Sequence, residues 1–173
     1  SPWVQKWPLY GETEKKNLQD VLDSDMWSQY PSKKDSGVPQ DKITHFENQF
    51  TEYIGARHGI SVANGTSALE VACRAIGTNP GDEIITPAYS FIASATCCYA
   101  ANAVPVFVEV EPEALRLDPD KVEAAITGRT RAIIAVHLDG YPCDMDRLMD
   151  IAARHNLIVI EDCARAHGTE WKG

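Results

Sequence analysis

From residue 60 onward, the chain alternates short runs of β-branched residues with longer segments of helical spacing. The runs are rich in Val and Ile and do not alternate apolar with polar positions. Such strands are typical of a parallel sheet that is covered on both faces. Strands are predicted at residues 60–63, 83–86, 104–110, 131–137 and 157–162. The sequence therefore predicts an α/β fold with a mostly parallel sheet and helices on both faces.

Helices are predicted before and between these strands, where apolar residues recur every three or four positions. They cover residues 12–23, 43–54, 66–76, 90–101, 117–126 and 145–155. Segment 27–40 is polar and contains Gly and Pro, so it is predicted to be a mobile loop. Residues 1–56 would then form an N-terminal helical segment with this loop, and residues 57–173 would form part of a larger ligand-binding domain.

The composition argues against several classes of function. The formal net charge is −9 and no basic stripe offsets it, which argues against binding of nucleic acid or of an anionic membrane. The longest apolar runs have the length of a strand, whereas a membrane-spanning helix needs about 20 residues. The five cysteines lack the C-x-x-C spacing of zinc ligands, so we expect no metal and interpret the thiols as small buried side chains of a cytoplasmic protein. They are Cys73, Cys97, Cys98, Cys143 and Cys163.

Polar or aromatic residues directly follow four of the predicted strands. The four exits read ANGTS, TPAYSF, HLDG and EDCARAH. In open parallel sheets, ligands bind at the carboxyl ends of the strands, so these exits are expected to form one site. The last exit begins with Glu161 and Asp162, and because side chains alternate along a strand, only one of these acids can face the site. A buried carboxylate also needs a partner of opposite charge.

Two common phosphate-binding patterns are absent from the sequence. The chain has no G-x-x-x-x-G-K-[ST] and no G-x-G-x-x-G motif, which argues against a nucleotide-hydrolysing site and against a dinucleotide site. Asp144 and Asp146 form a D-x-D pattern at the start of a predicted helix, where capping explains them. None of these patterns therefore defines the site.

The first strand exit has the features of an anion site. Asn64 and Gly65 turn the chain, and Thr66 follows at the start of a helix. Backbone N–H groups and the hydroxyls of Thr66 and Ser67 then lie together. Helix capping by Thr66 or Ser67 is the alternative. Phe91 follows the next strand and is expected either to stack on a flat ring or to pack in the core.

These features together match pyridoxal 5'-phosphate (PLP), a planar phosphorylated pyridine with a protonatable ring nitrogen. A phosphate cradle and a stacking aromatic ring would hold it, and the carboxylate of Asp162 would keep the nitrogen protonated. The protonated ring withdraws electrons from a bound substrate. The pyridinium would also offset the cost of removing Asp162 from water.

Five segments of the chain resemble the DegT-type sugar aminotransferases, a family of fold-type I PLP-dependent enzymes. They read ANGTSALEVACRAI, GDEIITPAYSFIASA, AVPVFVEVEP, AAITGRTRAIIAVHLDGYPCDMD and IVIEDCARAHGTEWKG, in this order. The resemblance extends from about Leu9 to Gly173 and is strongest to the branch that acts on keto-cyclitols in antibiotic pathways. It implies that residues 57–173 form part of the large PLP-binding domain of these enzymes.

The resemblance implies roles for the residues that match the motifs of the family. Gly65, Thr66 and Ser67 would bind the phosphate of the cofactor. Phe91 would stack on the pyridine ring, and Asp162 would pair with the ring nitrogen.

Four further residues occupy family positions near the site. Arg165 would lie beside the cofactor, where the family usually has Gln or His, so its fixed positive charge is a departure. Trp27 is implied to approach the substrate, with a packing role as the alternative. His137 and His167 are implied to lie on the substrate side, and each has a structural role as its alternative.

The resemblance also implies groups outside the 173 residues. The Schiff-base lysine and the small C-terminal domain are expected beyond Gly173, and a partner subunit is expected to complete the site of a homodimer. The chain by itself is therefore expected to be inactive.

The implied function is the transfer of an amino group from glutamate or glutamine to a keto-sugar or keto-cyclitol. Two alternatives remain open at this point. One is a PLP-dependent dehydratase of deoxysugars, which has a different residue at the lysine position. The other is a non-catalytic half-protein that binds the cofactor or a partner chain.

Overall fold

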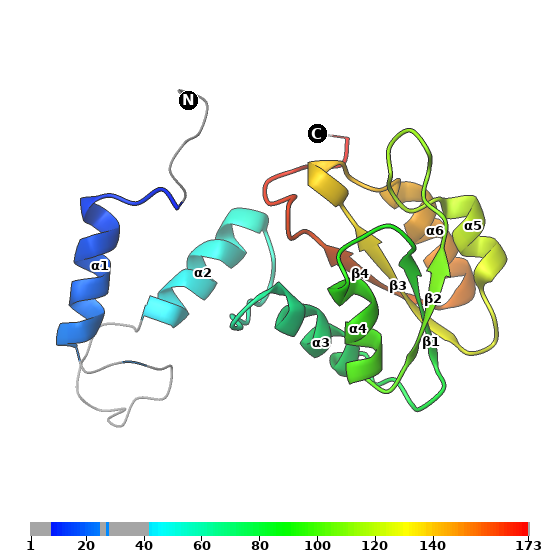
Figure 1. Cartoon of the computed structure of the whole chain (residues 1–173), viewed down its shortest axis with the longest axis horizontal. Coiled ribbons are helices and arrows are strands. Elements are labelled where there is room, and N and C mark those ends of the chain that lie inside the picture. Colours follow the sequence, from blue (N-terminus) through cyan, green and yellow to red (C-terminus); the bar gives the residue numbers. More distant parts are fainter. Residues whose placement is uncertain (1–7, 25–26, 28–41, 173) are drawn as a thin grey trace. The chain divides into compact units, whose positions relative to one another are not determined.

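The computed structural model describes residues 8–24, 27 and 42–172 (Figure 1). The chain divides into two units, with the division between Ser61 and Val62. The Trp- and Pro-rich start of the chain and most of the loop predicted at residues 27–40 lie outside the described residues. The domain boundary predicted after residue 56 stays a prediction.

The described part of the first unit contains two helices, and both were expected from their apolar spacing. α1 spans Glu12–Asp23 and α2 spans Lys42–Ile54. At the start of α1, the backbone N–H of Gly11 donates a hydrogen bond to Oε2 of Glu14 at 2.6 Å. α2 ends before Gly55, whose φ of +68° is a left-handed conformation that glycine adopts without strain.

The second unit is built on a parallel sheet. Its four strands are β1 (Glu83–Pro87), β2 (Val104–Val108), β3 (Thr130–Val136) and β4 (Ile158–Asp162). They lie in the order β2-β1-β3-β4, and every neighbouring pair is parallel (Figure 1). The carboxyl ends of all four strands therefore lie at the same edge of the sheet, where the sequence predicts the ligand site.

Helices cover both faces of this sheet, as predicted. They are α3 (Gly65–Ala75), α4 (Ala93–Ala100), α5 (Pro119–Ala125) and α6 (Met145–His155), with a short 3₁₀ helix, η1, at Leu138–Gly140. Ile84 and Ile134 pack in a core with α3 and α4, whereas Ile85 and Ile133 pack in a second core with α5 and α6. Successive strand residues thus face opposite layers, and this alternation decides which side chains can reach the site.

Residues 60–63 do not form the strand that their apolar composition predicts. Ile60 is 79% exposed, and the segment pairs with none of the four described strands. A strand is stable only beside a neighbour that pairs with its N–H and C=O groups. An apolar run does not reveal whether such a neighbour exists, and the prediction of a strand here is wrong.

The cysteines are free thiols, and four of the five are buried in the two cores, as their apolar surroundings predict. The exception is Cys163, which follows β4 and is half-buried. In the described part of the chain, no helix has both the length and the apolar character needed to cross a membrane.

Candidate functional site

A pocket lies at the carboxyl edge of the sheet. Its empty volume is about 330 Å³, including the part open to solvent. Residues at or after the ends of β1, β3 and β4 line it: Ser90, Phe91, Val136, His137, Leu138, Asp139, Asp162, Ala164 and Arg165. Three of the strand exits that were expected to form one site therefore meet here.

Asp162 is among the residues that line this pocket. Its Oδ1 accepts a hydrogen bond from the backbone N–H of Ala164 at 3.1 Å, which fixes the orientation of the carboxylate. Ile160, two residues earlier and on the same side of β4, packs against the core that contains α3 and α4. Asp162 therefore lies on the sheet face that carries these two helices.

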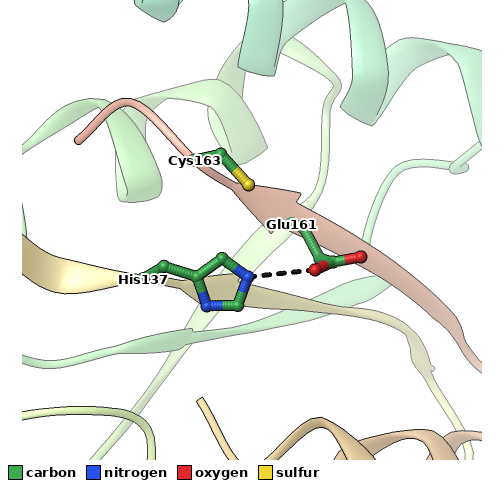
Figure 2. A group of neighbouring side chains, drawn as sticks. All are labelled: His137, Glu161 and Cys163. Carbon is green, nitrogen blue, oxygen red and sulfur yellow. Dashed lines mark hydrogen bonds and ion pairs between the residues drawn. The ribbon is translucent and has the colours of Figure 1, made fainter. Parts of the chain in front are cut away.

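Glu161 lies on the opposite face and meets His137 (Figure 2). Nε2 of His137 lies 3.0 Å from Oε2 of Glu161. This hydrogen bond lowers the pKa of the Glu161 carboxyl below its ordinary value. Because Glu161 has this partner, Asp162 is the acid of the pair that can serve a ligand in the pocket.

Phe91 lines the pocket and belongs to neither core. It is 71% exposed, although large apolar side chains are usually buried in a folded domain. Ordinary core packing, the alternative that the sequence left open, therefore does not describe this residue. An exposed aromatic face in the same pocket as a carboxylate suits a flat, positively charged ring.

Arg165 lies on the rim of the pocket in an ion pair with Asp139. Nη1 of Arg165 is 3.2 Å from Oδ1 of Asp139, and both side chains are exposed. Asp139 and Gly140 have φ angles of +51° and +89°, which turn the chain after β3. The positive φ of Gly140 favours glycine, whereas a Cβ there would make only an ordinary contact, 3.4 Å from the carbonyl oxygen of Arg165. The acid that holds Arg165 thus comes from the β3 exit.

The start of α3 carries the groups that an anion can bind. The cap is Asn64, whose Oδ1 accepts the Ser67 N–H at 2.9 Å, so capping does not occupy the hydroxyls of Thr66 and Ser67. Within the described residues, neither hydroxyl has a hydrogen-bond partner. A Cβ added at Gly65 would meet no atom within 4 Å. These residues do not line the pocket itself, but α3 packs on the same sheet face as Asp162.

His137, Glu161 and Cys163 form the one group of described side chains whose ligand atoms lie close enough together to hold a metal ion, all within 4.8 Å (Figure 2). The backbone N–H of Cys143 donates to Nδ1 of His137 at 3.1 Å. Nδ1 is therefore an acceptor, and the neutral ring carries its hydrogen on Nε2. An Nε2–H donates to Glu161 and offers no lone pair to a metal, so we interpret the group as a hydrogen-bonded pair with a neighbouring thiol.

Besides the three residues at the start of α3, two further predicted residues are not among those that line the pocket. Trp27 belongs to the first unit, where its side chain is exposed. His167 is exposed and follows Arg165 by two residues. Asp139, in contrast, lines the pocket and was missed in the sequence. Its signal is the Asp-Gly pair in HLDG, because Asp and Gly tolerate the left-handed conformations of a tight turn.

The fold and the pocket define a class of protein: an α/β domain with a pocket at the carboxyl ends of parallel strands, the place where open parallel sheets bind ligands. The chain belongs to the DegT/DnrJ/EryC1/StrS aminotransferase family, whose sequence pattern matches residues 8–173. It is 44% identical over 171 residues to the L-glutamine:scyllo-inosose aminotransferase of Streptomyces griseus, a match that covers 97% of this chain and 39% of that protein.

Solved structures of related proteins share the fold. The crystal structure of 3-amino-5-hydroxybenzoic acid (AHBA) synthase matches with a TM-score of 0.91 at 38% identity, over 100% of this chain and 43% of that chain. The structure of NtdA from Bacillus subtilis with bound cofactor PMP matches with a TM-score of 0.78 at 36% identity, over 88% of this chain and 33% of that chain. The chain spans about 40% of the length of the curated relatives that it matches.

Proposed function

We propose that this chain forms the cofactor-holding part of a PLP-dependent aminotransferase that acts on a keto-cyclitol or keto-sugar. The observation that carries this proposal is the pocket at the strand ends, where the Asp162 carboxylate and the exposed ring of Phe91 lie together. The names of two relatives, L-glutamine:scyllo-inosose and L-glutamine:2-deoxy-scyllo-inosose aminotransferase, support glutamine as the donor and a keto-cyclitol as the acceptor.

The chemistry of the pocket residues fits PLP. Asp162 would pair with the ring nitrogen and keep it protonated through its negative charge. Phe91 would cover one face of the ring. When bound, the protonated ring withdraws electrons from the substrate carbon that loses a proton. Arg165, which Asp139 orients, would place a fixed positive charge at the rim of the same pocket.

The start of α3 would bind the phosphate group. The N–H groups of Gly65 and Thr66 lie in the first turn of the helix and have no carbonyl acceptor within it. The positive end of the helix dipole also favours an anion there. The hydroxyls of Thr66 and Ser67 would add two further donors. The open space above Gly65 would let the phosphate approach the backbone.

Replacement of Gly65 by alanine is expected to weaken PLP binding about tenfold without lowering stability. The added methyl group would meet no protein atom within 4 Å, and alanine is the better helix former, but it would fill the space in front of the backbone N–H groups. An absorbance titration of the complete protein with PLP would give the dissociation constant, and the melting temperature would report on folding. Gly128→Ala is the matched control, because Gly128 is equally open but precedes β3 at the other edge of the sheet. Equal affinities of the Gly65 variant and the wild type would contradict the phosphate assignment.

The residue that moves the proton between substrate and cofactor is proposed to lie outside this chain. No lysine is among the residues that line the described pocket. Lysine is the residue that most PLP-dependent enzymes use as acid and base at this step. We propose that a longer polypeptide supplies this lysine and a further domain, that a second copy of the protein completes the site, and that the assembled enzyme works in the cytoplasm. The 173-residue chain alone would then be inactive.

An assay of the complete protein with PLP, L-glutamine and scyllo-inosose or its 2-deoxy form tests the function. We expect an aminocyclitol product that mass spectrometry detects and that does not form when PLP is removed. Replacing glutamine by glutamate would identify the preferred donor. A dehydrated deoxysugar in place of an amine would favour the dehydratase alternative, and PLP binding without any product from keto-cyclitols or keto-sugars would favour a non-catalytic role.

A further inference from the structure

His137 is buried at the end of β3 and binds both of the residues that end β4. It is only 6% exposed, although it borders the pocket. Its backbone N–H donates to the carbonyl oxygen of Asp162 at 3.1 Å, which continues the ladder between the two strands. Its ring lies 3.0 Å from Oε2 of Glu161 on the neighbouring strand (Figure 2). One residue at the end of β3 therefore holds both acids at the end of β4.

The ring of His137 is also fixed from its other side. The N–H of Cys143 donates to Nδ1 at 3.1 Å, and the buried thiol of Cys143 donates to the carbonyl oxygen of Val136 at 3.3 Å. Because Nδ1 accepts a hydrogen bond, the neutral ring carries its hydrogen on Nε2 and donates it to Glu161. A backbone group thus sets the direction of this hydrogen bond.

The end of β4 depends on this support. β4 is at an edge of the described sheet, with β3 as its only neighbour among the described strands, and its side chains are only partly buried or exposed. Asp162 is the last residue of the ladder with β3. Any rotation of the backbone at this point would swing the Asp162 carboxylate relative to a ligand in the pocket.

We propose that His137 is a positioning residue, which holds the end of β4 so that the Asp162 carboxylate meets the ring nitrogen of the cofactor. The inference rests on the proposed function, since it takes PLP as the ligand of the pocket. His137 acts through the Asp162 backbone and through the Glu161 side chain, so its role does not require contact with the substrate. A displacement of about 1 Å in such a group costs on the order of a hundredfold in rate.

Two substitutions test separately the two hydrogen bonds of the His137 ring, the one from the Cys143 N–H and the one to Glu161. In His137→Asn, the side-chain carbonyl can still accept the Cys143 N–H, but no donor reaches Glu161. In His137→Gln, the longer amide keeps a donor near the position of Nε2. In the complete protein, we expect His137→Asn to weaken PLP binding about tenfold and His137→Gln to stay within about threefold of the wild type.

The bound cofactor gives a second readout. If Asp162 is displaced in His137→Asn, the ring nitrogen is held less firmly in its protonated form, so the cofactor spectrum should titrate at lower pH. Melting temperatures would report on folding. Glu161→Ala removes the same hydrogen bond without altering the buried ring, so it takes the place of His137→Asn if that variant does not fold.

The outcomes distinguish this inference from the proposed function. Wild-type affinity and an unchanged spectral titration in His137→Asn or Glu161→Ala would overturn the inference, and so would equal losses in His137→Asn and His137→Gln. If Asp162→Asn loses PLP affinity while Glu161→Ala keeps it, the proposed function stands and the inference fails. If the wild-type protein does not bind PLP, both fail.

Discussion

Replacing Asp162 by asparagine is expected to lower the rate of amino transfer by the complete enzyme by about 10²- to 10³-fold. Asparagine keeps the size of the side chain and the oxygen that accepts the Ala164 N–H, so the local turn is preserved. The substitution removes the negative charge that, in the proposed function, keeps the ring nitrogen protonated. A neutral ring withdraws electrons less strongly, so kcat should fall more than cofactor affinity.

The measurement is kcat and KM for both substrates, together with the dissociation constant for PLP. Asp150→Asn is the matched control, because it removes the same charge from an exposed position on α6, where Asp150 pairs with Arg154 at 3.0 Å. We expect this control to change the rate by less than about twofold. Asp162→Ala also removes the bond to Ala164, so it should cost more than Asp162→Asn. Full activity of Asp162→Asn would show that this acid is not the partner of the ring nitrogen.

Replacing Ile134 by alanine is expected to lower the free energy of unfolding by about 2–5 kcal/mol. Ile134 is fully buried in β3 and packs in the core that contains α3 and α4. β1 and β4 flank β3, so the surroundings cannot easily collapse into the cavity. The core that contains α3 and α4 packs on the sheet face on which Asp162 lies. The loss of stability therefore also measures how well the part of the sheet beneath the site is packed.

Urea unfolding of the complete protein would measure the loss. Ile158→Ala makes the same chemical change on β4, where Ile158 is 46% exposed, and should cost about 1 kcal/mol or less. A loss at Ile134 no larger than the loss at Ile158 would contradict the assignment of Ile134 to the core.

The helices and most of the sheet could be predicted because their signals are local. α1 and α6 have the predicted bounds, and α6 begins with the expected cap, in which Oδ1 of Asp144 accepts the Arg147 N–H at 3.2 Å. The strand predicted at residues 60–63 failed because pairing depends on a distant segment, which composition does not encode. The same apolar composition can serve an extended connection to a helix.

The part of the candidate site that could be predicted follows from the rule that ligands bind at the carboxyl ends of parallel strands. That rule places Phe91, Asp162 and Arg165 in one pocket, and side-chain alternation separates Glu161 from Asp162. The partners of these residues were not predictable in the same way. The ion pair of Arg165 with Asp139 and the hydrogen bond from the Cys143 N–H to His137 join segments whose relative placement only the folded chain defines.

Because side chains alternate between the two faces of the sheet at the end of β4, the position of Asp162 depends more strictly on the number of residues in this strand than on their identity. Val159 and Ile160 pack in different layers, so other apolar residues of similar size could replace either of them. Insertion or deletion of a single residue before Glu161 would exchange the faces of the two acids. Glutamate would then enter the pocket, and aspartate would face His137 with a shorter side chain. During divergence of such proteins, the apolar residues of β4 can therefore be exchanged for others of similar size, whereas the number of residues in the strand has to stay the same.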